Sequence, residues 1–382
     1  MTIVSRTTAS SGAAPLMRLL LAAILLTAAS AAAAAIPPAE RAVLTALYNS
    51  MNGDQWFYNT NWCAGSCPKT GEPVFNQPGT ECTWTGVTCD SESTHVTGLY
   101  LPGGTGSLAD LSGLTKLENF SAPAQFGADR NYQLTGPIPD LSGLKALQIF
   151  FVADNQLTGS IPGLAGLMNL RYFDVSYNNL SGELPDLAGL TSLQTFNATH
   201  NQLSGSIPAL SGFDDPLDFD VSYNHLTGSI PTLQANALSA FVASHNNLTG
   251  AVPPLDGLTN LSGFQVDHNQ LSGSITVLNG LNLFVFDVSD NQLTGSLPSL
   301  SGLHTRTFYV QNNYLTGTLP APPSGLMYCE GISNIYCEAA ICPNSFDLVD
   351  SPAWDAWLGV TPWWATPHPN NQCDGVFTGG FD

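Results

Sequence analysis

Residues 174–187 read DVSYNNLSGELPDL, residues 220–233 read DVSYNHLTGSIPTL, and residues 287–300 read DVSDNQLTGSLPSL. The first two copies begin 46 residues apart, and the third begins 67 residues further on. A unit of 22 or 23 residues that recurs between them places all three copies in phase. Self-similarity at such a period is typical of repeat architectures, in which each unit contacts only its neighbours. The sequence therefore predicts a solenoid rather than several compact domains.

One asparagine per unit marks the repeat, within the phrase Asn-x-Leu-(Thr/Ser)-Gly. These asparagines are Asn155, Asn178, Asn201, Asn224, Asn246, Asn269, Asn291 and Asn313. Apolar residues stand five and three places before each of them, and this period of two predicts a strand with one buried face. The strands should stack into a parallel sheet, and each asparagine side chain should bond backbone groups where the chain turns inward.

The pattern LxxLxxFxVxxNxLTGxIP strongly resembles the plant-type leucine-rich repeat of polygalacturonase-inhibiting proteins and receptor-kinase ectodomains. The resemblance covers about residues 96–320, or ten repeats, with the first strands at Leu99 and Phe120. It implies a leucine-rich-repeat solenoid with a parallel β-sheet on the concave face, an irregular or 3-10 convex side and disulfide-bonded terminal caps. The stretch CTWTGVTC at 82–89 is similar to that family's amino-terminal cap, in which Cys82 would pair with Cys89. The insertion APAQFGADRN at 122–131 should form a loop.

Eight cysteines fall into two groups of four, one on either side of the repeats. They are Cys63, Cys67, Cys82, Cys89, Cys329, Cys337, Cys342 and Cys373. In an exported chain these groups predict terminal caps with two disulfides each, and the last four cysteines allow three pairings. Zinc is disfavoured, because neither group has a CxxC pair or a histidine at ligand spacing. The chain thus divides into a signal peptide at 1–35, an amino-terminal cap at 36–95, repeats at 96–320 and a carboxyl-terminal cap at 321–382.

The first residues carry the pattern of a secretory signal peptide. Arg6 and Arg18 precede the apolar run LLLAAILL at 19–26, and a stretch of small residues follows. Cleavage is expected near 31–35. A transmembrane helix is the alternative, but the apolar run is short for a membrane anchor. We expect a secreted protein that is extracellular, periplasmic or cell-wall associated, without membrane insertion.

The chain is strongly acidic, with 9 Lys and Arg, 29 Asp and Glu, and a formal net charge of −20. No Lys or Arg occurs between Arg171 and Arg306. This charge argues against nucleic acid or anionic lipid as a partner, since both require a basic surface. It permits a basic protein or peptide, a cation or a neutral glycan.

Residues one, two, four and six places before each asparagine are expected to face solvent on the concave side. Two tyrosines and three histidines in successive units share the position one place before. Aromatic and imidazole groups combine contact area with hydrogen bonds, which favours binding of a peptide or a sugar. The predicted partner-binding residues are Asp174, Tyr177, His200, Asp220, Tyr223, His245, Asp267, His268 and Asp287. The alternative is that the scaffold merely tolerates these side chains at exposed positions.

Two kinds of chemistry are disfavoured. A zinc or calcium ion could be imagined near His245 and His268, or beside Asp218 and Asp220, but no ligand loop of the DxDxDG type is present and a solvated acidic face is preferred. For catalysis, the sequence has no phosphate loop or nucleophile elbow. The prediction therefore includes no metal, no cofactor and no enzymatic activity. Histidines on the face could make binding depend on pH.

The predicted function is that of a secreted, non-enzymatic recognition protein that binds a protein or peptide through its concave face. The resemblance adds inhibition of a secreted hydrolase as a possible role. The alternative is a structural or adhesive module of a cell surface or matrix, with weak glycan binding.

Overall fold

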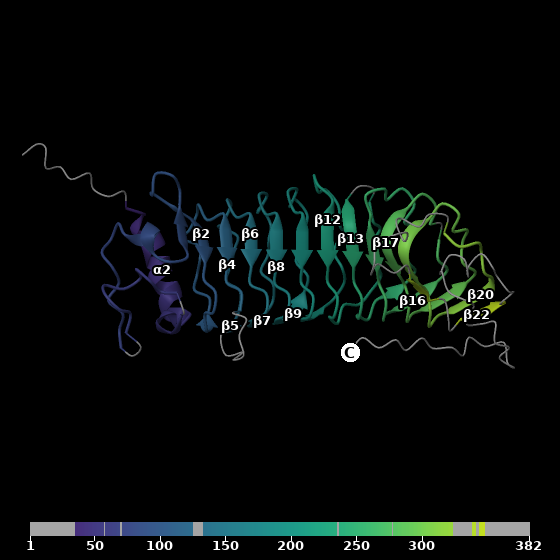
Figure 1. Cartoon of the computed structure of the whole chain (residues 1–382), viewed down its shortest axis with the longest axis horizontal. Coiled ribbons are helices and arrows are strands. Elements are labelled where there is room, and N and C mark those ends of the chain that lie inside the picture. Colours follow the sequence, from purple (N-terminus) through teal and green to yellow (C-terminus); the bar gives the residue numbers. More distant parts are fainter. Residues whose placement is uncertain are drawn as a thin grey trace, which may run out of the picture.

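The structure is a computed structural model that describes residues 35–56, 58–68, 71–124, 133–234, 237–276, 278–323, 338–340 and 344–347. Within these ranges the repeats wind into an elongated coil whose turns lie side by side (Figure 1). The predicted leucine-rich-repeat solenoid is confirmed. Residues 1–34 of the predicted signal peptide at 1–35, residues 125–131 of the insertion and the four carboxyl-terminal cysteines lie outside the described residues.

A 12-stranded sheet runs along the coil, and all ten predicted repeat strands belong to it. Its first pair is antiparallel, and each later pair, from β2–β4 to β19–β21, is parallel. In sheet order the strands are β1 Val87–Cys89, β2 Val96–Tyr100, β4 Asn119–Ser121, β6 Ile149–Phe151, β8 Tyr172–Asp174, β10 Thr195–Asn197, β12 Leu217–Asp220, β13 Leu238–Val242, β15 Gly263–Gln265, β17 Asn282–Asp287, β19 His304–Tyr309 and β21 Glu338–Ala340. Strand β21 adds a turn within the predicted carboxyl-terminal cap.

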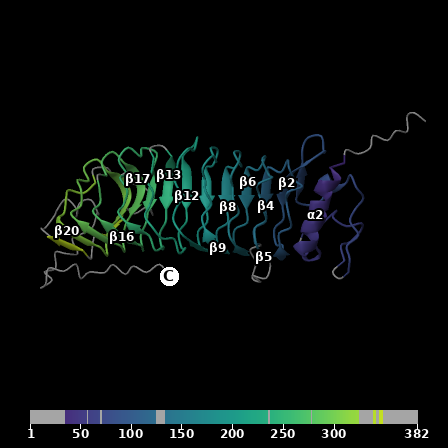
Figure 2. The same ribbon diagram turned by 180° about the vertical axis from the view of Figure 1, so that it is seen from behind.

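A second ladder of short parallel strands, which the sequence analysis did not predict, forms two five-stranded sheets (Figure 2). The first sheet contains β3 Gly106–Ser107, β5 Leu134–Gly136, β7 Gln156–Gly159, β9 Asn179–Glu183 and β11 Gln202–Ser204. The second contains β14 Thr249–Gly250, β16 Gln270–Gly273, β18 Gln292–Gly295, β20 Tyr314–Thr318 and β22 Ser345–Asp347. The extended Leu-Thr-Gly segments pair because each turn repeats the one before it.

The remaining side of the coil is irregular, as predicted, and consists of turns such as those at 142–143 and 145–146. The backbone N–H of Leu144 donates to the carbonyl oxygen of Leu141 at 2.9 Å, and that of Leu147 donates to Leu144 at 3.0 Å, which is the hydrogen-bond pattern of the predicted 3-10 conformation. In the part of the chain that the structure describes, the 3-10 helices Gly53–Gln55 and Glu81–Thr83 both belong to the amino-terminal cap. None of the described helices is long and apolar enough to span a bilayer.

Stacked phenylalanines form the centre of the core. One ring per turn, from Phe120 to Phe308, stacks on the next with ring centroids 5.4 to 6.0 Å apart. These rings and the valines two residues later, such as Val175, are fully buried. The predicted period-two burial is confirmed, and it places the intervening residues on the outer face of the sheet.

The asparagine ladder bonds the inward turns, as the sequence predicts. The Nδ2 group of Asn178 donates to the carbonyl oxygens of Val152, Val175 and Ser176, each at 3.0 Å. Its Oδ1 accepts from the backbone N–H of Leu157 at 2.9 Å. One side chain therefore links its own turn to the preceding turn and satisfies buried backbone groups in both.

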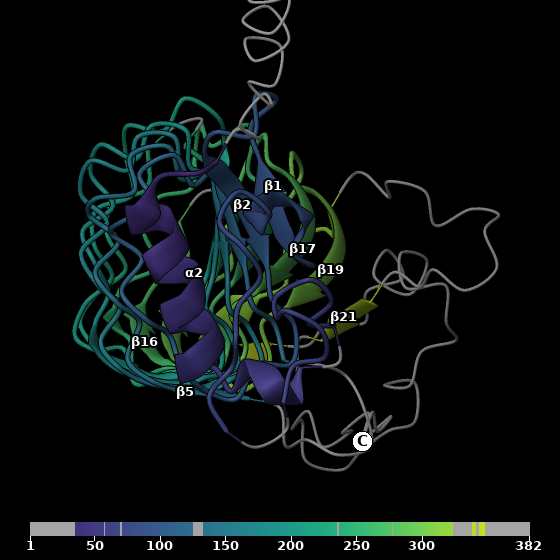
Figure 3. The same ribbon diagram turned by 90° about the vertical axis from the view of Figure 1, so that its left-hand side faces the viewer.

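Helix α2 Pro38–Ser50 lies across the first turn of the coil (Figure 3). Its buried Glu40 accepts a hydrogen bond from the backbone N–H of Val96 at 2.7 Å, which ties the helix to β2. Disulfides join Cys63 to Cys67 and Cys82 to Cys89, so the pairing that the resemblance implied is confirmed. The cap therefore covers the apolar end of the repeats.

Candidate functional site

The residue immediately before each asparagine lies at a corner where the chain leaves the 12-stranded sheet. Every one of these residues has a left-handed backbone, with φ between 51° and 59°. Asn, Asp and His adopt this conformation more readily than bulky residues do. They are Asp154, Tyr177, His200, Tyr223, His245, His268, Asp290 and Asn312.

The corner changes one expectation from the sequence. Residues two places before the asparagine were expected to face solvent, but Ser176, Thr199, Ser222, Ser244 and Ser289 are buried. The left-handed residue one place before the asparagine changes the direction of the chain. The side chain of the residue before it therefore lies inside the turn and does not follow the in-and-out alternation of a strand. Asp267 occupies the same position and is part-buried, with its side chain 16% exposed.

Five side chains at successive corners form one continuous stack, which we call the ring ladder: Tyr177, His200, Tyr223, His245 and His268. Successive ring centroids are 4.3, 4.1, 4.2 and 4.0 Å apart, and the planes differ by 9° to 17°. Tyr177 is 51% exposed and Tyr223 is 44% exposed. The ladder thus presents a rigid strip of aromatic and imidazole edges to solvent.

The three repeated aspartates, Asp174, Asp220 and Asp287, lie on the outer face of the sheet and are half-buried. Each accepts a hydrogen bond from the backbone N–H two residues later, at 2.9, 2.9 and 3.0 Å. Their first role is therefore to hold the corner of their own turn, which carries a ring of the ladder, Tyr177 or Tyr223, after Asp174 and Asp220, and carries Asp290 after Asp287. Each is half-buried, so part of its side chain remains exposed on the outer face.

Burial shifts two of these carboxyl groups toward the neutral form. It raises the pKa of Asp287 to about 6, with a further contribution from the Asp267 carboxylate. Burial also raises the pKa of Asp220, against the hydrogen bonds from Ser222. In contrast, burial and the neighbouring His268 lower the pKa of His245, which favours its neutral imidazole.

The ninth predicted residue, Asp267, lies between two rings of the ladder. Its Oδ2 is 3.0 Å from His268 Nδ1 and 3.8 Å from His245 Nε2. All nine predicted partner-binding residues therefore lie along one strip, at the edge or on the outer face of the 12-stranded sheet.

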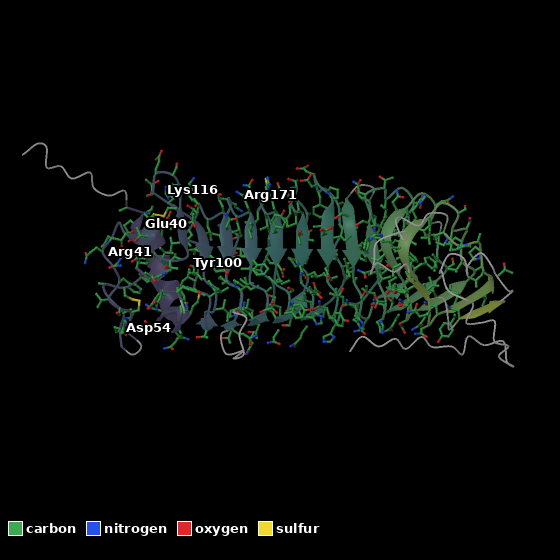
Figure 4. All side chains as sticks on the ribbon, viewed as in Figure 1. Glu40, Arg41, Asp54, Tyr100, Lys116 and Arg171 are labelled. Atoms are coloured by element: carbon green, nitrogen blue, oxygen red, sulfur yellow. A yellow bond between two sulfur atoms is a disulfide. The ribbon has the colours of Figure 1, made fainter. Side chains whose placement is uncertain are left out.

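In the part of the chain that the structure describes, the segment that carries most of this strip contains no basic residue. Lys116 and Arg171 lie at the upper edge of the coil (Figure 4). The next basic residue along the chain is Arg306, whose guanidinium lies 4.7 Å from the centre of the Phe284 ring. All five residues of the ring ladder thus fall in the segment without Lys or Arg.

Sequence reasoning missed a second regular surface, on the second ladder of strands. One exposed hydroxyl residue per turn forms a column that we call the hydroxyl face: Thr135, Thr158, Ser181, Ser204, Thr227, Thr249, Ser272, Thr294 and Thr316. Parallel pairing sets neighbouring strands about 4.8 Å apart. The signal was present in the repeated Leu-(Thr/Ser)-Gly phrase, which the sequence analysis treated as scaffold.

The columns on either side of the hydroxyl face are also exposed and almost free of charge. One holds mainly Gln and Asn, as at Gln156 and Gln292, and the other holds mainly Ser, as at Ser160 and Ser274. Glu183 is the single acidic or basic residue in the described part of these two columns, apart from the titratable His225. The face is therefore regular, small-featured and nearly neutral.

Comparison with known proteins supports the architecture. The model of the Leucine Rich Repeat family matches residues 169–189. The crystal structure of a plant ice-binding protein is similar at 25% identity and a TM-score of 0.58, over 75% of this chain and 90% of that chain. A search of curated protein sequences finds no match.

One receptor structure shows the same coil. The crystal structure of PEPR1–AtPEP1 is similar at 23% identity and a TM-score of 0.59, over 75% of this chain. The ectodomain of the Arabidopsis receptor kinase HAESA, in complex with an extended IDA peptide hormone, is similar at 27% identity and a TM-score of 0.49, over 63% of this chain. The chain spans 40% and 42% of these two structures, which is less than half of their length.

Proposed function

We propose that the chain, a leucine-rich-repeat solenoid, is a secreted, non-enzymatic recognition protein that binds a protein or peptide through the outer face of its 12-stranded sheet and the adjoining ring ladder. The observation that carries this proposal is the continuous stack of five exposed rings. Such a strip is pre-organised, so little conformational entropy is lost when a partner binds.

The tyrosines at the corners strengthen this interpretation. A left-handed backbone costs an ordinary residue about 1–2 kcal/mol, and Asn or Asp would satisfy the corner at lower cost. Tyr177 and Tyr223 nevertheless occupy corners and remain about half exposed. Tyrosine is also among the residues that contribute most at protein interfaces. Stacking on the histidines offsets part of the strain, and contact with a partner would use the exposed part of the ring.

The charge of the strip favours a basic partner. Acidic side chains border the ring ladder, and no Lys or Arg lies between residues 171 and 306. Such a field attracts a basic peptide or protein and raises its association rate at low salt. A secreted hydrolase that this chain would inhibit is one partner of this kind to test. A glycan held weakly by a matrix module is the alternative outcome of the same experiment.

The test uses Tyr177→Asn together with Tyr223→Asn, because Asn312 shows that asparagine fits this corner. The secreted chain and the double variant are each used to capture partners from the native secretome. We expect the native chain to capture a partner with saturable binding and the double variant to lose it. The melting temperatures of the native chain and the double variant should differ little. Equal retention by both proteins would contradict the role of the ladder.

A second candidate function rests on the hydroxyl face. Its exposed hydroxyls recur once per turn on a paired strand ladder, with almost no charge nearby. The similar plant structure, which this chain matches over 90% of that protein's length, is described as ice-binding. A regular array of small hydroxyl groups can hold an ordered water layer. We therefore offer binding to ice through the hydroxyl face as the second candidate.

This candidate is tested by Thr227→Tyr together with Thr249→Tyr, which places two bulky rings in the array. If the face binds ice, the native chain inhibits ice recrystallisation and lowers the freezing temperature of water below its melting temperature (thermal hysteresis). The double variant should lose most of both effects. The ring-ladder variant is the matched control and should keep the native ice activity. A native chain without either effect would exclude this function.

A further inference from the structure

Asp267 is the one acidic residue beside the ring ladder that the repeat does not explain. The aspartates at 174, 220 and 287 share one repeat position, whereas Asp267 stands two places before its asparagine. The other turns carry small or neutral residues at that position, namely Ala153, Ser176, Thr199, Ser222, Ser244, Ser289 and Gln311. The adjacent turns bury the hydroxyl residues Ser244 and Ser289 at this position, whereas this turn holds the part-buried carboxylate of Asp267. The repeat pattern therefore does not explain Asp267.

The Asp267 carboxylate lies between two imidazoles from adjacent turns. Its Oδ2 is 3.0 Å from His268 Nδ1 and 3.8 Å from His245 Nε2. One ligand atom from each of the three residues lies within 4.8 Å of the others. Two nitrogens and one carboxylate oxygen are the donors of many zinc sites that keep one position open.

These distances are close to those of a tetrahedral zinc site. With ligand bonds of 2.0–2.1 Å, the donors of such a site are about 3.3 Å apart. The observed separations of 3.0 and 3.8 Å lie on either side of this value. The two rings stack 4.0 Å apart with their planes 16° apart, so both side chains must rotate out of this stack before their in-plane lone pairs can point at one ion.

The surroundings hold the carboxylate and leave room for the ion. The Ser244 hydroxyl donates to Asp267 Oδ1, which directs Oδ2 toward the imidazoles. Such second partners orient metal ligands and raise metal affinity. His268 is 49% exposed and His245 is 34% exposed, so the open position faces solvent. The Asp290 carboxylate, 3.9 Å from His268 Nδ1, adds negative potential.

We propose that His245, Asp267 and His268 form a zinc-binding site at one end of the ring ladder, with the fourth position open to water or to a ligand group of a bound partner. Imidazole donors favour zinc over calcium and magnesium, which prefer oxygen ligands. The geometry thus goes beyond the sequence, which favoured a solvated acidic face at these residues. The site does not depend on the proposed peptide or ice binding.

The experiment titrates the secreted chain, purified without a histidine tag, with Zn²⁺ by isothermal titration calorimetry. We expect saturable binding of one ion per chain. Asp267→Ser restores the residue that most other turns carry, so it should fold normally and weaken binding roughly tenfold or more. His268→Asn, which suits the left-handed corner, should have a similar effect. His200→Asn is the matched control, because the next turn offers Ser222 rather than a carboxylate, and it should leave zinc binding unchanged.

A second readout separates a built site from adventitious binding. Zn²⁺ should raise the melting temperature of the native chain and of His200→Asn, and it should not raise that of Asp267→Ser. Ca²⁺ at the same concentration should have little effect on any of them. Absence of saturable zinc binding, or equal zinc affinity in the native chain and Asp267→Ser, would overturn the proposal.

Discussion

At the residue scale, the corner before each asparagine links backbone conformation to the candidate site. The chain needs a left-handed residue there in every turn, and the structure places Asp, Asn, His and Tyr at these positions. The corner residue projects its side chain outward and recurs once per turn, so rings at successive corners stack on one another. The ring ladder therefore follows from the left-handed corner that every turn requires.

The half-buried Asp287 should make the stability of the protein depend on pH. Its pKa is raised to about 6 from 3.8, chiefly by burial, so the folded protein holds the proton more tightly than the unfolded chain does. Its contribution to stability is full below pH 3.8 and is lost as the pH rises through about 6. Each pKa unit corresponds to about 1.4 kcal/mol, so the total loss is about 3 kcal/mol.

We predict that Asp287→Asn reduces the fall in unfolding free energy between pH 4 and pH 7. Asparagine fits this position, because Asn197 in the same repeat position accepts the hydrogen bond of Thr199 N–H at 3.1 Å. Urea denaturation of both proteins at the two pH values measures the difference. Asp256→Asn is the matched control, because it removes one carboxyl group at an exposed position. An unchanged pH profile in Asp287→Asn would rule out this account.

At the scale of the element, the asparagine ladder holds the two strand ladders together. Asn201 accepts from the backbone N–H of Leu180 at 2.9 Å and donates to the carbonyl oxygen of Val175 at 3.0 Å, both in the preceding turn. It also donates within its own turn to Ala198. These groups are buried, so no water replaces the side chain when it is removed.

We predict that Asn201→Ala lowers the unfolding free energy by about 3 kcal/mol, because it leaves several buried backbone groups without a partner. Asn201→Asp keeps the acceptor and loses the donors, so it should also be destabilising. Denaturant titration measures both effects. The exposed neighbour Gln202→Ala should change stability by no more than about 0.5 kcal/mol. If Asn201→Ala lowered the unfolding free energy by no more than Gln202→Ala does, the asparagine ladder would not be a major source of stability.

At the scale of the whole molecule, stability comes from contacts between neighbouring turns and from the amino-terminal cap. Among the described strands, those far apart in the sequence do not pair, because the order of the strands in each sheet follows the chain. In such a one-dimensional array, the total stability is close to a sum over turns and the contacts between them. Removing one complete turn should therefore preserve the rest.

We predict that deletion of residues 178–200 gives a folded, shorter coil. This 23-residue deletion joins Tyr177 to Asn201 and keeps the repeat in phase, so the melting temperature should fall by no more than about 5 °C. It should also stack Tyr177 on Tyr223. Circular dichroism and thermal melting compare it with deletion of residues 178–188, which breaks the phase and should unfold the chain. Equal damage from both deletions would contradict a modular array.

The coil, the parallel sheet and the roles of the repeated residues could be predicted from the amino-acid sequence. A period of 22 or 23 residues cannot bury its apolar strand face within one unit, so the stacking of Phe173 on Phe196 and the bonding role of Asn178 follow from the pattern. The Cys82–Cys89 pairing followed from family resemblance. These features are local and periodic, so one chain is enough to deduce them.

The contacts between side chains on different turns became visible only in the folded coil. The left-handed corner turned Ser176 inward and carried Tyr177 outward, which strand alternation alone does not predict. Pairing between turns created the second strand ladder and its hydroxyl face. The approach of Asp267 to His245 depends on the distance between adjacent turns, and that distance is set by packing rather than by any single repeat.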